Sequence, residues 1–184
     1  MAKRDIPIVI NLIGGPGTGK STIAAGLFHE LKKQGVNCEL ALEFAKDKVY
    51  EESFKTMDDQ IYVFAKQYHK QWRLKGKVDV IITDSPLLIS LHYMKEKSKY
   101  FNDLVIEQYN KFDNMLYFLH REGNYQTEGR MQTEDEAKLI DLSIKHILIT
   151  TAKDIKYKTL KRETAISTIL SDIYEQHHDI FDET

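Results

Sequence analysis

The strongest chemical signal in the chain is a glycine-rich segment that ends in a lysine and a hydroxyl residue. Residues 14–21 read GGPGTGKS and match the pattern G-x-x-x-x-G-K-[ST]. Glycines let backbone N–H groups approach a phosphate closely, where a Cβ would obstruct them. We expect Lys20 to supply charge to the β- and γ-phosphates, and the Ser21 hydroxyl to ligate Mg²⁺. The segment therefore predicts a phosphate-binding loop for a nucleoside triphosphate.

The sequence around this loop supports the prediction. An apolar run at residues 6–13 precedes it, and residues 20–33 carry apolar side chains at helical spacing. The positive end of such a helix adds to the attraction for phosphate. A glycine-rich turn without a ligand is the alternative, but it does not explain why strand, loop and helix follow in order. The residues expected to hold the triphosphate are Gly15, Gly17, Thr18, Gly19, Lys20, Ser21 and Thr22.

A second candidate for metal chemistry is Asp84, which follows the apolar run 78–83. This is the pattern of a Walker B acid, which would hold Mg²⁺ opposite the Ser21 hydroxyl. Asp84 is also suited to cap a helix that begins near Pro86, and both roles are compatible. The next residue is Ser85 rather than a glutamate. This argues against a motor-type ATPase, in which a glutamate at that place activates water.

Glu43 is the candidate acid on the acceptor side, at the end of a strand expected over residues 36–44. A carboxylate there is placed to orient or deprotonate an acceptor hydroxyl. A solvated glutamate paired with Lys46 or Lys48 is the alternative interpretation. Asp47 is a weaker substitute one turn later.

The polar segment 121–132 has the composition of a lid. It contains two glycines and the arginines Arg121 and Arg130. Arginine donates bidentately to phosphate, so a closing loop with arginines suits transition-state charge. We expect Arg130 to act from the lid and Arg121 to orient phosphate or a neighbouring carboxylate, both as catalytic residues, with Arg121 also contacting substrate. An ordinary surface loop with its arginines paired to nearby glutamates is the alternative.

Aromatic and amide side chains gather in the region that follows residue 58. Phe64 and Tyr68 are explained by a helix face in the core, whereas Gln67 is harder to place there. We therefore predict that Gln67 contacts the acceptor together with Glu43.

These residues need a scaffold, which the alternation of apolar runs and amphipathic segments supplies. Strands are expected at 6–13, 36–44, 78–84, 114–119 and 157–161, and helices at 20–33, 58–75, 102–111, 133–149 and 165–177. This order predicts an α/β fold: a three-layer α/β/α P-loop NTPase fold with a mostly parallel five-stranded sheet. Ligands bind at the carboxyl ends of such strands, so the loop, Glu43, Asp84 and Arg121 should face one crevice.

Size and composition fit one domain over residues 1–184, with the lid at about 121–132. The chain is 42% hydrophobic and 29% charged, with a net charge of −2. It has one cysteine, Cys38, so an internal disulfide is excluded. No apolar stretch reaches membrane-spanning length and no signal peptide is seen, so we expect a cytoplasmic protein without a membrane partner.

The sequence pattern resembles a known group once these residues are taken together. Gly14 to Ser21, the segment 43–46, Asp59-Gln60 with Gln67, and Asp84 resemble the small P-loop kinases related to the nicotinamide riboside kinase domain. Residues 121–134 resemble the lid of nucleotide kinase-like proteins from large bacteriophages. The resemblance implies transfer of the γ-phosphate of ATP, with Mg²⁺, to a nucleoside, nucleotide or related small acceptor. It also implies that two copies pair, as small kinases often do.

Two other functions stay open at this point. A kinase acting on a hydroxyl of DNA or of a modified base needs a basic groove, and the net charge of −2 disfavours it. A local basic run is compatible with such a kinase, and it consists of Lys66, Lys70, Arg73, Lys75 and Lys77. Runs of this kind are more commonly solvated helix faces. A non-kinase ATP-binding or ATPase module would leave Glu43 and the lid unexplained.

Overall fold

A parallel five-stranded sheet forms the centre of the molecule. The computed structural model describes residues 4–96, 98–122 and 133–181. The strands are β1 (Ile8–Ile13), β2 (Cys38–Leu40), β3 (Val80–Thr83), β4 (Asp113–Leu119) and β5 (Lys158–Leu160), and the order is β2-β3-β1-β4-β5. All four pairings are parallel, and Ile10 of the central strand lies between Ile82 and Met115. The carboxyl ends of the strands therefore meet at one edge of the sheet.

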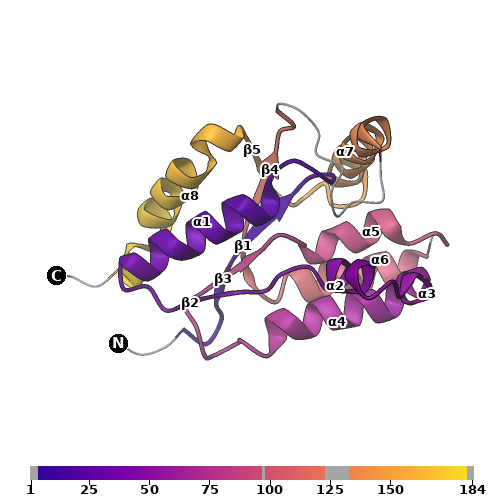
Figure 1. Cartoon of the computed structure of the whole chain (residues 1–184). Coiled ribbons are helices and arrows are strands. Elements are labelled where there is room, and N and C mark those ends of the chain that lie inside the picture. The colour runs from indigo at the N-terminus through magenta and orange to yellow at the C-terminus, as the bar shows by residue number, and fades with distance from the viewer. Residues whose placement is uncertain (1–3, 97, 123–132, 182–184) are drawn as a thin grey trace.

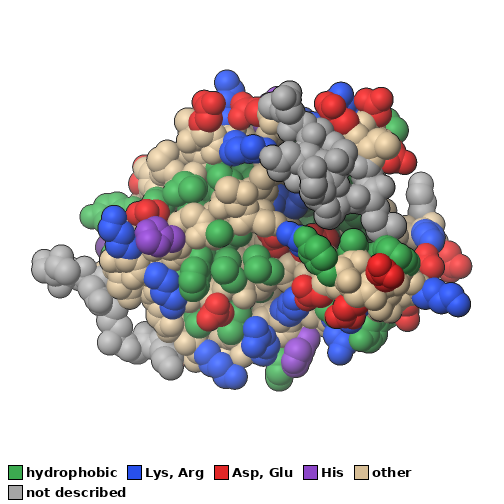
Figure 2. Space-filling view, in the orientation of Figure 1, with side chains coloured by type: hydrophobic (Ala, Val, Ile, Leu, Met, Phe, Trp, Pro, Cys, Tyr) green, Lys and Arg blue, Asp and Glu red, His purple; other side chains and the backbone are tan. Residues whose placement is uncertain are grey.

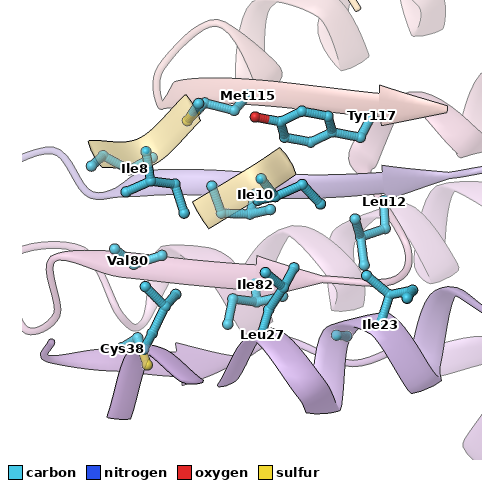
Figure 3. Close-up of a cluster of buried hydrophobic side chains, with 14 of the residues drawn as sticks. Ile8, Ile10, Leu12, Ile23, Leu27, Cys38, Val80, Ile82, Met115 and Tyr117 are labelled. Atoms are coloured by element: carbon cyan, nitrogen blue, oxygen red, sulfur yellow. The ribbon is translucent and has the colours of Figure 1, made fainter. Parts of the chain in front are cut away.

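Two helices cover one face of the sheet. They are α1 (Lys20–Lys33) and α8 (Arg162–His177), which lie side by side in Figure 1. The core on this face contains Ile10, Leu12 and Ile82 from the strands and Leu27 from α1 (Figure 3). These side chains are fully buried, which anchors the helix that begins at Lys20 directly behind the phosphate loop.

Helices α4 (Gln60–Trp72), α6 (Lys99–Tyr109) and α7 (Glu134–Thr150) cover the opposite face. Their core includes Phe64, Val105 and Ile144, packed with Phe118 of β4. The shorter helices α2 (Phe44–Tyr50), α3 (Phe54–Asp58) and α5 (Ser90–Tyr93) lie near the carboxyl edge of the sheet, together with a 3₁₀ turn at Leu87–Ile89. The predicted three-layer fold is confirmed.

Several predicted boundaries were wrong. The second strand ends at Leu40 rather than at residue 44, and Glu43 lies directly before helix α2. The long helix expected over residues 58–75 is α4, which begins at Gln60 and ends at Trp72. Asp59 caps its start, and the Asp59 carboxylate accepts a hydrogen bond from Tyr62 N at 3.1 Å. Helix α8 begins three residues before its expected start, at Arg162. Periodicity alone does not reveal such ends, because caps and short turns set them.

The start of α7 agrees with the sequence. Thr133 and Glu136 form a capping box, in which the Thr133 hydroxyl accepts from Glu136 N and the Glu136 carboxylate accepts from Thr133 N at 2.7 Å. Most of the expected lid, including Arg130, lies outside the described residues. Within the described part of the chain, no helix is long and apolar enough to span a membrane.

Candidate active site

The loop between β1 and α1 has a backbone that glycine favours. Gly14, Gly17 and Gly19 have φ values of 152°, 85° and 91°, in the region that side chains with a Cβ rarely adopt. A Cβ at Gly14 would also lie 3.1 Å from the carbonyl oxygen of Leu119. The loop therefore depends on glycine at these positions, for both its conformation and its packing against β4.

Lys20 points back over this loop. Its Nζ donates to the carbonyl oxygens of Gly14 at 2.8 Å and Gly15 at 2.9 Å. Burial lowers the pKa of Lys20, while the carboxylates of Glu43, Asp84 and Asp141 act against this shift. The result is a cation held inside the curve of the loop, where a phosphate chain would bind.

Ser21 and Asp84 meet as the sequence predicts. The Ser21 hydroxyl donates to Asp84 Oδ2 at 2.5 Å, and the backbone N–H of Glu43 donates to Asp84 Oδ1 at 3.0 Å. Asp84 is 3% exposed and follows the buried strand β3 directly. A hydroxyl and a carboxylate oxygen side by side are the donor types that Mg²⁺ prefers, so this pair fits a magnesium ion. Among the described residues no cluster of three or more His, Cys, Asp or Glu could hold a metal, so phosphate oxygens and water would supply the remaining ligands.

Glu43 lies at the junction between the loop and a second chamber. Burial raises the pKa of its carboxyl group, and the nearby charge of Lys20 opposes that rise. Both effects are consistent with a partly buried carboxylate near the Lys20 ammonium. Burial, reinforced by the negative charge of Glu43, also raises the pKa of the Tyr93 hydroxyl. Glu43 and Tyr93 both line the cavity that the phosphate loop opens into.

One cavity of about 490 Å³ joins these groups. Its inner half is lined by the phosphate loop, with Lys20, Ser21 and Asp84. Its outer half is lined mainly by α2, α4 and α5, and the residues there are Glu43, Ala45, Lys46, Val49, Tyr50, Met57, Gln60, Val63, Gln67, Ser85, Ile89, Ser90, Tyr93 and Lys95. A cavity of this size, lined by aliphatic, aromatic and polar side chains, suits a small organic molecule beside the phosphates.

Gln67 lines this cavity, but its amide is already engaged. Its Oε1 accepts from Phe44 N at 3.0 Å, and its Nε2 donates to Ala41 O at 3.2 Å and Thr83 Oγ1 at 3.4 Å. It is 3% exposed. These bonds tie α4 to the segment between β2 and α2. Gln67 therefore holds the backbone on both sides of Glu43, at Ala41 and Phe44. A direct contact between Gln67 and an acceptor stays a prediction.

Arg121 lies beside the phosphate loop rather than among the described residues that line the cavity. Its Nη1 donates to Pro16 O at 2.7 Å and its Nε to Asp141 Oδ2 at 2.9 Å. Asp141 Oδ1 also accepts from Gly15 N at 2.6 Å. These bonds fasten the first half of the loop to α7, and a catalytic role for Arg121 stays a prediction.

Removing the Asp141 carboxylate should loosen this attachment. Asp141 and Arg121 side chains are 14% and 12% exposed, so their ion pair is shielded from water. We expect Asp141→Ala to lower the free energy of unfolding by about 3 kcal/mol, because the shielded Arg121 guanidinium loses the carboxylate that it pairs with. Urea denaturation measures this change. Glu107→Gln, which breaks the exposed pair with Lys111, is the matched control and should cost less than about 1 kcal/mol. Equal losses in the two variants would contradict the assigned role.

Two residues that contact the phosphate loop were not singled out from the sequence. Arg162 donates from Nη2 to Gly17 O at 3.2 Å, and a Cβ at Gly19 would lie 2.7 Å from its Nε. Arg162 is the first residue of α8, next to the carboxyl end of β5, so the strand-end rule applied to the fifth strand would have found it. Asp141 lies within α7, and no local pattern marks it.

With this geometry in place, comparison with known proteins decides the family. A family model described as an AAA domain matches residues 9–168. The chain belongs to this AAA-domain family. Among curated proteins, none matches it.

Solved structures show that this AAA-domain protein has the fold of small P-loop kinases. NadR protein in complex with NR has a TM-score of 0.65 and 19% identity, over 90% of this chain and 51% of NadR. The chain thus spans about half of the NadR protein. Deoxyadenosine kinase from M. mycoides with bound dATP has a TM-score of 0.55 and 18% identity, over 90% of this chain and 98% of that one. Shikimate kinase from Acinetobacter baumannii has a TM-score of 0.54 and 12% identity, over 94% and 95%. The predicted resemblance to a P-loop kinase-like family is confirmed.

Proposed function

We propose that the protein is an ATP-dependent phosphotransferase that moves the γ-phosphate of Mg-ATP to a nucleoside or nucleotide acceptor. One observation carries this proposal: the cavity continues past the phosphate loop into a chamber between α2, α4 and α5, and the partly buried Glu43 lines it. A protein that only hydrolyses ATP has no use for such a chamber. An acceptor bound in this chamber would have its hydroxyl between Glu43 and the phosphates.

The inner half of the cavity would bind and polarise the triphosphate. Lys20 supplies positive charge to the phosphates, and the loop N–H groups hold them in place. Ser21 and Asp84 would hold Mg²⁺, which neutralises charge on the phosphates when bound. The guanidinium of Arg162 lies against Gly17 and Gly19 and adds positive charge to the outside of the loop. An action of Arg130 from the lid belongs to the proposal as well.

Glu43 would prepare the acceptor. The acceptor oxygen forms a bond to the γ-phosphorus while the bond from that phosphorus to the bridging oxygen of ADP breaks. The hydroxyl proton passes to the Glu43 carboxylate and then to water. A raised pKa suits this role, because a carboxylate that ionises nearer to neutral pH is a stronger base.

The outer half of the cavity favours an acceptor without a phosphate. Of the described residues that line it, Lys46 and Lys95 are the cations, and Lys95 is bound by Asp58 at 2.6 Å. The carboxylate of Glu43 would repel a second anion in the same space. Tyr50, Tyr93 and the aliphatic walls offer surfaces on which a base can lie. The complex of NadR with NR and the name of the deoxyadenosine kinase support an acceptor of the nucleoside class.

We therefore expect uncharged nucleosides to be better acceptors than their 5′-monophosphates. The ratio of kcat/KM should favour the nucleoside by about 100-fold, because like charges that face each other are costly. Lys46→Gln should change kcat/KM for the nucleoside by less than about threefold, since Lys46 is exposed. A preference for monophosphates that Lys46→Gln abolishes would reverse the assignment.

The experiment that tests the proposed function is ADP formation from Mg-ATP. The acceptors are a panel of nucleosides, nucleoside monophosphates, nicotinamide riboside and short DNA. A rise in ADP with one free acceptor, together with a phosphorylated product, supports the proposal. ATP consumption that no acceptor accelerates would overturn it in favour of an ATPase. Pairing of two copies, a bacteriophage source and a cytoplasmic location stay predictions.

A further inference from the structure

The outer face of α4 and the loop after it carry an unusual concentration of positive charge. Residues 60–78 contain the five cations Lys66, Lys70, Arg73, Lys75 and Lys77 and no aspartate or glutamate. The chain as a whole has a net charge of −2. The cations of this segment therefore concentrate positive charge on one part of the chain.

Most of this charge is not neutralised by neighbouring residues. Lys70 pairs with Asp47 at 3.2 Å. Among the described residues, no carboxylate oxygen lies within 4.0 Å of the charged nitrogens of Lys66, Arg73, Lys75 and Lys77. We call these four residues, together with Tyr62, His69 and Trp72, the basic face. Each of its members is exposed.

Aromatic rings lie between these cations. His69 stacks on Trp72 with 5.7 Å between ring centroids and 27° between planes. Trp72 is 52% exposed, although tryptophan is among the side chains that gain most from burial. Lys66 Nζ lies 5.2 Å from the ring centroid of Tyr62. Flat aromatic surfaces next to cations are the combination that binds nucleobases and their phosphates.

The geometry of α4 connects the basic face to the active site. Tyr62, Lys66, His69 and Arg73 recur at spacings of three and four residues, which places them along one side of the helix. Val63 and Gln67, on another side of the same helix, line the cavity. In the orientation shared by Figures 1 and 2, a histidine and several Lys and Arg side chains lie on the lower face, near the carboxyl end of α4.

We propose that the basic face binds single-stranded nucleic acid. Lys66, Arg73, Lys75 and Lys77 contact phosphates, and the His69–Trp72 pair stacks on a base. A single strand is favoured over a duplex because its bases are free to stack on protein rings. This inference goes beyond the proposed kinase activity and does not depend on it. An anionic membrane would also attract the cations, and the experiment separates these two partners.

Trp72 provides a direct readout because it is the one tryptophan in the chain. The full protein is titrated with oligo(dT) of about 16 nucleotides, while tryptophan fluorescence and the anisotropy of a labelled oligonucleotide are followed. We expect saturable quenching. The logarithm of the binding constant should fall with the logarithm of salt concentration with a slope of about −3, as four phosphate contacts to a single strand require.

Charge variants locate the surface. Replacing Lys66, Arg73, Lys75 and Lys77 together by glutamine should weaken binding about tenfold or more. The matched control replaces Lys32, Lys33, Lys153 and Lys156, which are equally exposed but lie on α1 and after α7. The control should bind as the unchanged protein does. Trp72→Ala should weaken binding, and Trp72→Phe should restore most of it. Circular dichroism melting confirms that each variant folds.

Three results would overturn the inference. Equal weakening in both charge variants would mean diffuse attraction instead of a defined surface. Absence of quenching by the oligonucleotide would exclude stacking on Trp72. A blue shift with phosphatidylserine vesicles, without oligonucleotide binding, would assign the face to a membrane. Nucleoside-dependent ADP formation, measured in parallel, reports the proposed kinase function independently of all three.

Discussion

Replacement of Lys20 by alanine is expected to lower kcat by about 10³-fold, because charge stabilisation supplies most of the catalysis in phosphoryl transfer. Lys20 is placed to act on phosphate, since its Nζ lies 2.8 Å and 2.9 Å from the carbonyl oxygens of Gly14 and Gly15 inside the loop. The measurement is ADP formation at saturating ATP and acceptor. Lys46→Ala, at the edge of the same cavity, is the matched control.

The pH dependence of the rate gives a second test of Lys20. Burial lowers the pKa of Lys20 from its ordinary value of 10.5. As pH rises through the lowered pKa, the ammonium loses its proton and the rate should fall. Phosphate binding raises that pKa again, so the fall should begin at a lower pH in kcat/KM for ATP than in kcat. A Lys20→Ala protein with nearly normal turnover would remove the phosphate loop from the mechanism.

The residues that the structure places where the sequence predicts are those with a clear pattern in the neighbouring sequence. The phosphate loop needs glycine for its backbone, and Gly14, Gly17 and Gly19 have the positive φ values that this requires. Asp84 follows an apolar strand, and the strand-end rule brings it to Ser21. In both cases one local pattern determines the backbone and the position of the side chain.

The contacts that sequence reasoning missed join distant parts of the chain. Asp141 reaches Gly15 across 126 residues, and Arg162 reaches Gly17 across 145. No periodicity encodes such contacts, because they depend on how α7 and α8 pack on the sheet. The hydrogen bonds of Gln67 could not be predicted for the same reason. Its polarity within a helix predicted a ligand contact, and in the structure its amide bonds to Phe44, Ala41 and Thr83.

Glu43 was predicted to lie in the crevice because it was expected at the end of a strand, and that strand end was wrong. The strand expected to carry it ends at Leu40, and Glu43 instead precedes helix α2. The residue still reaches the cavity because its backbone N–H is bound by Asp84 at 3.0 Å. Glu43 lines the cavity because loops that leave the carboxyl edge of a parallel sheet begin in the same crevice as the strands themselves.

This backbone contact makes Glu43→Gln a clean test of the side chain. The substitution keeps the N–H that Asp84 binds and keeps nearly the same volume, but removes the base. We expect kcat to fall by about 10²- to 10⁴-fold, while KM for ATP changes by less than about threefold. Glu39→Gln, which alters a carboxylate on β2 that does not line the cavity, should leave both constants unchanged.

The pH profile distinguishes a base from a carboxylate that only shapes the cavity. Burial raises the pKa of Glu43 above its ordinary value of 4.5 despite the opposing charge of Lys20. The rate of the unchanged protein should therefore fall on acidification at a pH above 4.5, as the carboxylate takes up a proton. Glu43→Gln has no group to protonate there, so its residual rate should lack that acidic limb. If the limb persists in Glu43→Gln, another group is the base; if kcat is unchanged, Glu43 does not take part in the transfer.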